Sequence, residues 1–260
     1  MAIITLTSDM GLDDFYVASV KGTIYKELDE VRVVDITHQI DSFNIAKAAF
    51  AIKHTYSDFP KKTIHIVAVD TESTLHQPHL LILFDGHYFI GPDNGLFSLV
   101  FERAPEAIYE LDMKQESDEL SFPAKHIYAR AAAHIARGGT PEIIAKAREK
   151  IRAKTAFNPI VEGDHVLKGA VIYIDKYGNI ISNITRNSFQ HIGKGRDFVI
   201  WFRKEEFSIN KLSTSYSDVE PGELLAMFSS LGYLEIAINK GSAKGLFATN
   251  INDIIRVEFK

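Results

Sequence analysis

Three carboxylates follow the first short apolar run of the chain, in the segment Ser8-Asp9-Met10-Gly11-Leu12-Asp13-Asp14. A helical pattern begins directly after them, so this segment is a turn between a strand and a helix. In a parallel α/β sheet, ligands bind beyond the carboxyl ends of the strands. Three carboxylates disfavour a phosphate and favour a hydroxyl-rich or cationic ligand, such as the vicinal hydroxyls of a ribose. The alternative is that Asp13 and Asp14 only cap the helix and compensate its dipole.

Polar residues also end the next apolar runs. One run ends beside His38, which is either an acid or base or a structural hydrogen-bonding group. Another ends at Asp70, which is either a base or orienting group or the cap of a turn. His76 and His79 follow, but two histidines without a clear third ligand make a weak metal site. The segment Gly91-Pro92-Asp93-Asn94-Gly95 is best explained as a tight turn into a helix.

The second half of the chain carries two further candidates. Tyr177, Asn179 and Asn183 place one aromatic ring and two amides close together, a set suited to stacking on a base and hydrogen-bonding its edge. A simple turn is the alternative. Glu235 interrupts an apolar run, and an inward-facing carboxylate there needs a cation or hydrogen-bond donors. A solvent-facing position is the alternative.

Two kinds of fold position these residues. Up to about residue 150, strand and helix periods alternate. The strand at 31–36 is rich in β-branched residues, so we expect it to be largely covered. Strands are expected at 3–8, 31–36, 63–70, 79–84 and 87–90, and helices at 15–28, 44–57, 95–103, 126–137 and 141–152.

From residue 165 onward, short β segments and turn signals dominate. The expected strands are 168–175, 179–184, 197–202, 224–228, 233–238 and 254–259. We therefore predict an α/β N-terminal domain over residues 1–157 and an all-β, barrel-like C-terminal domain over residues 158–260, joined around 153–164.

Composition excludes several classes of protein. The 260 residues are 46% hydrophobic and 24% charged, as in an ordinary soluble protein. The net charge of −5 argues against a nucleic-acid binder. Cysteine is absent, which removes disulfides, thiolate nucleophiles and zinc-thiolate sites. We see no signal peptide and no run of roughly 18 apolar residues, so we expect no membrane association and a cytoplasmic location.

Motifs along nearly the whole chain match one family in the same order. They are Ser8-Asp9-Met10-Gly11, Asp14-Phe15-Tyr16-Val17, Lys21-Gly22, Val34-Asp35-Ile36-Thr37-His38, Val69-Asp70, Pro92-Asp93-Asn94-Gly95, Ile174-Asp175, Gly178-Asn179, Asn183-Ile184, Gly232-Tyr233-Leu234-Glu235-Ile236-Ala237 and Gly241-Ser242-Ala243. The chain thereby resembles the S-adenosylmethionine hydrolases (adenosine-forming), in the superfamily that also contains the adenosyl fluorinase and chlorinase.

The resemblance implies the fluorinase-like fold, a homotrimer, and a ligand held between the first domain of one subunit and the second domain of its neighbour. S-adenosyl-L-methionine is then a substrate or ligand, with neither cofactor nor metal. By position, Asp14 is similar to the carboxylate that holds the ribose hydroxyls, with Asp9 beside it, and Phe43 to an aromatic against the ribose or sulfonium region. The other implied contacts are Ser73, Asn158 and Asp175 as polar groups, Tyr177 and Asn179 at the adenine, and Ser230 and Glu235 near the methionine part.

The chain departs from the family at the reacting centre. The hydrolases that it resembles use an Asp-Arg-His set near the nucleophilic water. The aspartate is Asp70, but the arginine falls at Gln77 and the histidine falls at Pro123. We predict Asp70 and Gln77 as the catalytic residues. The groups that can replace the missing pair are His76, Gln77, Lys125 and His126.

The resemblance leaves three functions open. The first is hydrolysis of S-adenosyl-L-methionine by displacement at C5′, where orientation of the water is the main demand because the sulfur leaves as a neutral thioether. The second is a non-catalytic adenosine- or S-adenosylmethionine-binding protein with a degraded Asp-Arg-His set. The third is displacement on another adenosyl substrate. Halogenation is not expected, since halogenases carry a tyrosine in place of Asp70, and a carboxylate there repels a halide.

Overall fold

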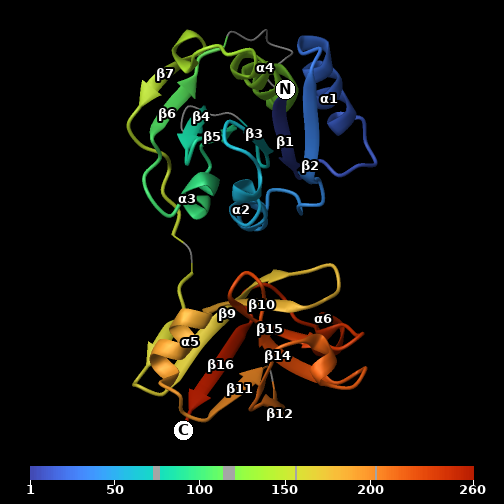
Figure 1. Ribbon diagram of the computed structural model, residues 1–260, viewed down its shortest axis with the longest axis vertical. Coiled ribbons are helices and arrows are strands. Elements are labelled where there is room, and N and C mark those ends of the chain that lie inside the picture. The colour runs from blue at the N-terminus through green and yellow to red at the C-terminus, as the bar shows by residue number, and fades with distance from the viewer. Residues whose placement is uncertain (73–76, 114–120, 156, 203) are drawn as a thin grey trace. The chain divides into compact units, whose positions relative to one another are not determined.

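A computed structural model describes residues 1–72, 77–113, 121–155, 157–202 and 204–260. The chain divides into two compact units, Met1–Thr155 and Ala156–Lys260, coloured blue to yellow-green and yellow to red in Figure 1. Each unit is described by itself. The predicted domain limits at 157 and 158 stay a prediction. Within the described residues, no helix has the length and apolar character needed to cross a bilayer.

The first unit is built on a seven-stranded sheet with the order β2-β1-β3-β5-β4-β6-β7. β1 pairs in parallel with β2 and β3, and β3 pairs in parallel with β5, whereas β4, β6 and β7 are joined by antiparallel pairing. The strands are β1 (Ala2–Ser8), β2 (Val31–Thr37), β3 (Ile64–Ala68), β4 (His79–Phe84), β5 (His87–Pro92), β6 (Ala107–Leu111) and β7 (Ala145–Arg148). Because β1, β2 and β3 are parallel, the loops that follow them leave the same edge of the sheet.

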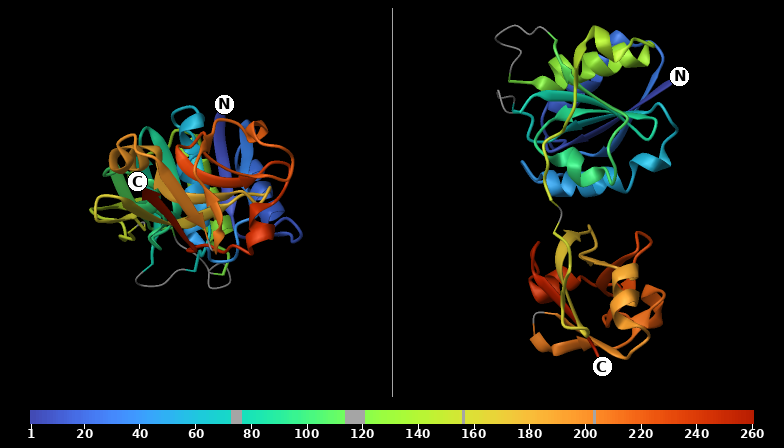
Figure 2. Two further views of the ribbon diagram at one scale, coloured as in Figure 1. Left: turned by 90° about the horizontal axis from the view of Figure 1, so that it is seen from below. Right: turned by 90° about the vertical axis from the view of Figure 1, so that its left-hand side faces the viewer.

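Helices cover both faces of this sheet, as Figure 2 shows. The α-helices are α1 (Tyr16–Glu27), α2 (Ile45–Lys53), α3 (Leu96–Val100) and α4 (Ala129–Ala136). A π-helical segment, η3 (Ala124–Tyr128), leads into α4, and η1 (Tyr56–Asp58) and η4 (Pro141–Ile143) are 3-10 turns. α1 and α4 pack with Ile64 and Ile66 of β3, whereas α2 and α3 pack with Val67. Successive strand residues point to opposite faces, so two separate apolar layers enclose β3.

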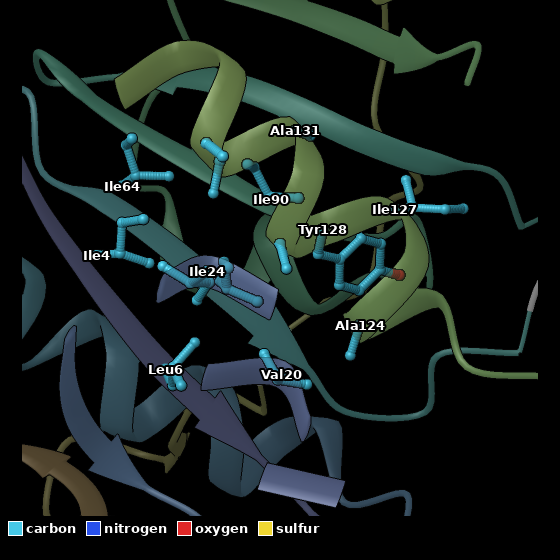
Figure 3. Packing of buried hydrophobic residues seen from close by; sticks show 14 of the residues in the cluster. Ile4, Leu6, Val20, Ile24, Ile64, Ile90, Ala124, Ile127, Tyr128 and Ala131 are labelled. Carbon is cyan, nitrogen blue, oxygen red and sulfur yellow. The ribbon is translucent and has the colours of Figure 1, made fainter. Parts of the chain in front are cut away.

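The layer under α1 and α4 is shown in Figure 3. Ile4 and Ile64 from the sheet meet Ile24 from α1 and Tyr128 at the start of α4, and all four are fully buried. Burial of each aliphatic side chain contributes about 1.5–3 kcal/mol to stability. This packing holds the ends of β1 and β3 in place, and both ends carry predicted site residues.

Tertiary pairing overturns two expectations in this unit. The segment predicted as a helix at 141–152 is a short turn followed by β7, because residues 145–148 pair antiparallel with β6. The strand predicted at 31–36 is not largely covered: β2 lies at the edge of the sheet, and none of its residues is buried. The predicted hairpin of β4 and β5 is confirmed.

The second unit is a mostly β, nearly closed barrel-like sheet with the order β12-β11-β16-β9-β10-β15-β14-β13, to which β8 adds by pairing with β9. Its strands are β8 (Ile160–Glu162), β9 (Val166–Ile174), β10 (Ile180–Thr185), β11 (Phe198–Phe202), β12 (Lys204–Ile209), β13 (Leu212–Ser213), β14 (Leu224–Phe228), β15 (Tyr233–Ile238) and β16 (Ile254–Phe259). Its helices are α5 (Arg186–Gly193), η5 (Tyr216–Asp218) and α6 (Ala243–Phe247). The predicted fold class is therefore confirmed, although β8, β12, β13 and the helices of this unit were not predicted.

Candidate functional site

The Asp9 carboxylate contacts the main chain of two other predicted residues of the first unit. It follows β1 directly, and its Oδ2 accepts a hydrogen bond from the main-chain nitrogen of Phe43 at 2.9 Å. The same oxygen lies 3.4 Å from the main-chain nitrogen of Asp70, which follows β3. Three polar loops at one edge of the sheet thus converge on one carboxylate.

The two residues that donate to Asp9 have unusual backbone conformations. Phe43 has φ +64° and Asp70 has φ +51°, both in the left-handed region. For residues with a Cβ this region costs about 1–2 kcal/mol, and such strain gathers where a fixed geometry serves function. The side chain of Phe43 is 72% exposed, so its ring is presented to solvent rather than to the core.

Gln77 contacts the main chain of Asp70. Its Nε2 donates to the carbonyl of Asp70 at 3.0 Å and to the carbonyl of Glu72 at 2.9 Å. The predicted catalytic pair is therefore adjacent, and the amide nitrogen of Gln77 is committed to the loop. Whether the amide oxygen orients a water stays a prediction. Ser73 and His76 lie outside the described residues.

Asp14 stands apart from this group. It is exposed just before α1, whose N-cap is Phe15, and no side-chain hydrogen bond caps that helix. The capping part of the alternative for Asp13 and Asp14 is therefore wrong, whereas compensation of the helix dipole stays a prediction. Asp14 is exposed to solvent, and its ribose contact stays a prediction.

His38 and His79 are buried and hydrogen-bonded within this unit. His38 is buried, with Nδ1 2.7 Å from the Ser8 hydroxyl and Nε2 3.1 Å from Asp35 Oδ1. Although partial burial acts in the opposite direction, hydrogen bonds from Lys21 and His38 lower the pKa of Asp35.

His79 is equally enclosed. Its Nδ1 is hydrogen-bonded to the Tyr128 hydroxyl at 2.7 Å, and burial lowers its pKa to about 4, so it is neutral at physiological pH. Across the described part of the chain, no group of three His, Cys, Asp or Glu residues is arranged to hold a metal.

The second unit holds a hollow of about 600 Å³, within the size range of small-molecule sites. The Asp175 carboxylate accepts three hydrogen bonds at one side of this hollow. Its Oδ1 accepts from the main-chain nitrogens of Tyr177 and Asn179, and its Oδ2 accepts from Asn179 Nδ2, all at 2.9 Å. Gly178 between them has φ +84°, and a Cβ there would collide with the Ser242 hydroxyl. Three predicted residues therefore lie together in one rigid turn.

Tyr216 also lines this hollow and was not predicted. Its hydroxyl donates to Glu235 Oε1 at 2.7 Å, and Glu235 is only 3% exposed. The solvent-facing alternative for Glu235 is therefore wrong. Burial raises the pKa of Glu235, and the nearby charge of Asp175 adds to that rise. Burial and the bond to Glu235 raise the pKa of Tyr216. The sequence around Tyr216 carries no signal beyond a turn rich in serine.

Two predicted contacts lie elsewhere in this unit. Ser230 is exposed in the turn between β14 and β15, and Asn158 is exposed near the start of the unit, and neither lines the hollow. Phe157, beside Asn158, is held by its carbonyl, which accepts from Asn183 Nδ2 at 2.5 Å. Their ligand contacts stay predictions.

Comparisons with known proteins agree over the length of both units. Residues 4–145 match the SAM hydroxide adenosyltransferase N-terminal domain, and residues 169–256 match the C-terminal domain of the same family. A protein of Methanocaldococcus jannaschii named (R)-S-adenosyl-L-methionine hydrolase is 28% identical, covering 98% of this chain and 95% of that protein. A protein of Nocardia brasiliensis named fluorinase is also 28% identical, covering 92% and 91% of the two chains.

A solved structure of an uncharacterised conserved protein from Thermotoga maritima has a similar fold. It aligns with a TM-score of 0.87 at 28% identity, covering 98% of this chain and 99% of that one. Because the two family domains match in order and together span most of the residues, the chain belongs to the SAM hydroxide adenosyltransferase family.

Proposed function

We propose that this protein hydrolyses S-adenosyl-L-methionine to adenosine and L-methionine. The observation that carries the proposal is the match of both family domains, in order, together with full-length similarity to relatives named as hydrolases of this substrate. The hollow around Asp175, Tyr177 and Asn179 supports it, because its groups suit a purine.

The purine assignment follows from the amide of Asn179. One of its N–H groups is donated to Asp175, which settles the orientation of the amide. One N–H donor and the carbonyl acceptor remain, and asparagine uses this pair to contact the edge of adenine. The ring of Tyr177 is 77% exposed beside it and offers a face for stacking. We assign Tyr177 and Asn179 to the adenine on this basis.

The reaction itself asks little of proton chemistry. The water oxygen forms a bond to C5′ while the C5′–S bond breaks. The electron pair of the C5′–S bond stays on sulfur, which leaves as a neutral thioether. One proton of the water is then released. We assign Asp70 to hold the water and accept that proton, with Gln77 fixing the loop. Asp9, Asp14 and Phe43 are assigned to the ribose and sulfonium.

The remaining contacts are proposed in the same way. Glu235, with Ser230, is assigned to the methionine part, as the resemblance implies; the Glu235 carboxylate accepts a hydrogen bond from Tyr216, which lines the hollow. Asn158 and Ser73 are kept as further polar contacts. Homotrimeric assembly and a cytoplasmic location are also proposed. The first is supported by exposed apolar side chains such as Leu12 and Phe15, which are 61% and 67% exposed. Light scattering coupled to gel filtration measures the assembly.

The test is direct. The purified protein is incubated with S-adenosyl-L-methionine, and adenosine and methionine are quantified by chromatography. Asp70→Ala is expected to lower turnover by about 10²-fold or more, as loss of a base does. Asp58→Ala, which removes an exposed carboxylate from η1, serves as the control. Calorimetric titration with adenosine accompanies the assay. Tight adenosine binding without product would instead establish the non-catalytic binding protein.

A further inference from the structure

The turn that follows β5 is anchored in the interior of the first unit. Asp93 is buried, and its Oδ2 accepts from Arg148 Nη2 at 2.9 Å while its Oδ1 accepts from the main-chain nitrogen of Arg152 at 2.7 Å. The next residue, Asn94, is 8% exposed. The main chain of the turn is therefore fixed, and the side chain of Asn94 points toward the end of β3.

The side-chain amide of Asn94 bridges two segments. Its Nδ2 donates to the carbonyl of Val69 at 3.0 Å and to the carbonyl of Asp70 at 3.3 Å. Its Oδ1 accepts from the main-chain nitrogen of Leu96 at 3.1 Å. Both N–H groups are thus spent on consecutive carbonyls at the point where β3 ends.

Those carbonyls belong to the residue pair in which the backbone turns. Asp70 has φ +51°, a conformation that costs about 1–2 kcal/mol for a residue with a Cβ and persists only where its surroundings hold it. Its carbonyl receives Asn94 and Gln77, and its nitrogen faces Asp9. The direction in which a side chain leaves the main chain depends on φ and ψ, so these contacts set the direction of the Asp70 carboxylate.

We propose that Asn94 is a positioning residue, whose amide holds Asp70 in its left-handed conformation and thereby aims the Asp70 carboxylate. The inference rests on the proposed function, in which Asp70 holds the attacking water. Asn94 touches neither the water nor the substrate. It acts through the main chain, and a misplacement of about 1 Å at a reacting group can cost up to about 10²-fold in rate.

Asn94→Asp is the decisive variant because it keeps the size and removes both donors. At about pH 8 the introduced carboxylate faces two carbonyl oxygens, so Asp70 is released and kcat falls by about 10- to 100-fold. KM stays within about 3-fold, because the lost interaction serves the transition state rather than binding. At lower pH the introduced carboxyl, whose pKa burial raises, regains one O–H donor. The deficit in kcat relative to the unmodified protein therefore shrinks as the pH falls.

Two variants make this reading specific. Asn94→Ser retains one shorter donor and no titratable group, so its kcat deficit is expected at every pH without recovery in acid. Asn187→Asp introduces the same charge at an exposed position of α5 and is expected to keep the unmodified kcat, KM and pH profile. A kcat deficit in Asn94→Asp that does not change with pH, or a rise in KM without a fall in kcat, overturns the proposal.

A readout without turnover separates this inference from the proposed function. Hydrogen–deuterium exchange followed by mass spectrometry reports the peptide that contains Asp70. We expect faster exchange there in Asn94→Asp than in Asn187→Asp. If the unmodified protein releases no adenosine but exchange is faster, the hydrolase proposal fails while the contact between Asn94 and the Asp70 main chain holds. If exchange is unchanged in Asn94→Asp, the positioning role fails whatever the activity.

Discussion

Tyr216→Phe removes one hydroxyl and leaves the ring that lines the hollow of the second unit. That hydroxyl donates to Glu235, a carboxylate that is 3% exposed. Hydrogen bonds to charged groups contribute about 1.5–3 kcal/mol, and removing one partner leaves the other unsatisfied. Because Tyr216 is 42% exposed, water can partly replace the hydroxyl. We therefore expect a loss of about 2 kcal/mol in the free energy of unfolding when Glu235 is ionised.

The loss depends on pH in a definite direction. Burial raises the pKa of Glu235 in the folded protein, so the folded state binds this proton more tightly than the unfolded chain. Stability from this group is fully present below its ordinary pKa and is lost as the pH rises through the raised value. Without the Tyr216 donor, the pKa of Glu235 rises further, because the hydrogen bond from Tyr216 acts to lower it. The difference between the two proteins is therefore small below the ordinary pKa of Glu235 and grows as the pH rises through the raised value.

Urea unfolding at a series of pH values measures this difference. Tyr25→Phe, which removes an exposed hydroxyl from α1, is the matched control and is expected to be neutral at every pH. A loss in Tyr216→Phe that is the same in acid and at neutral pH would show that Glu235 is not the partner that matters. No loss at any pH would refute the buried hydrogen bond itself.

The remaining predictions concern the first unit. Burial lowers the pKa of His65 to about 3 and that of His79 to about 4, so the unfolded chain takes up protons first as the pH falls below the ordinary value of 6.5. The free energy of unfolding should then fall by about 1.4 kcal/mol per pH unit for each histidine between about pH 6 and 5, and a flat urea-unfolding profile there contradicts this. Asp14→Ala should weaken adenosine binding by about 1.5–3 kcal/mol in calorimetry, and an unchanged Kd removes Asp14 from the ribose contact. Arg148→Met leaves the buried carboxylate of Asp93 without its ion pair and should destabilise the protein by about 2–3 kcal/mol in urea, whereas a neutral result means that the pair is not needed.

Local patterns were sufficient wherever a residue's role is set by its neighbours in sequence. β14, β15 and β16 begin and end where the alternation of apolar residues predicted. Asp175, Tyr177 and Asn179 lie within one turn, so their proximity followed from the sequence alone. The strand predicted at 63–70 ends two residues earlier, at Ala68, so Asp70 lies just after β3.

Local patterns failed where a distant segment decides the outcome. Residues 145–148 were predicted as helix, but they form a strand because they pair antiparallel with β6. Tyr216 was missed because its partner Glu235 lies 19 positions away, and the residues next to Tyr216 do not indicate this contact. Asn94 was assigned to a turn, which is correct, but its reach to Val69 and Asp70 depends on how β3 and β5 lie side by side.

The order of amino acids by itself determined that polar groups end the strands of an α/β sheet and that a compact β unit follows, because hydrophobic periodicity is a local property of the chain. Folding decided which of the carboxylates lose water and which keep it: Asp93 and Glu235 are buried, whereas Asp14 stays exposed. It also decided that Asp70 adopts a left-handed backbone between three side chains drawn from separate segments. Desolvation and hydrogen-bond geometry are set by atoms brought together from distant parts of the chain, and periodicity carries no record of them.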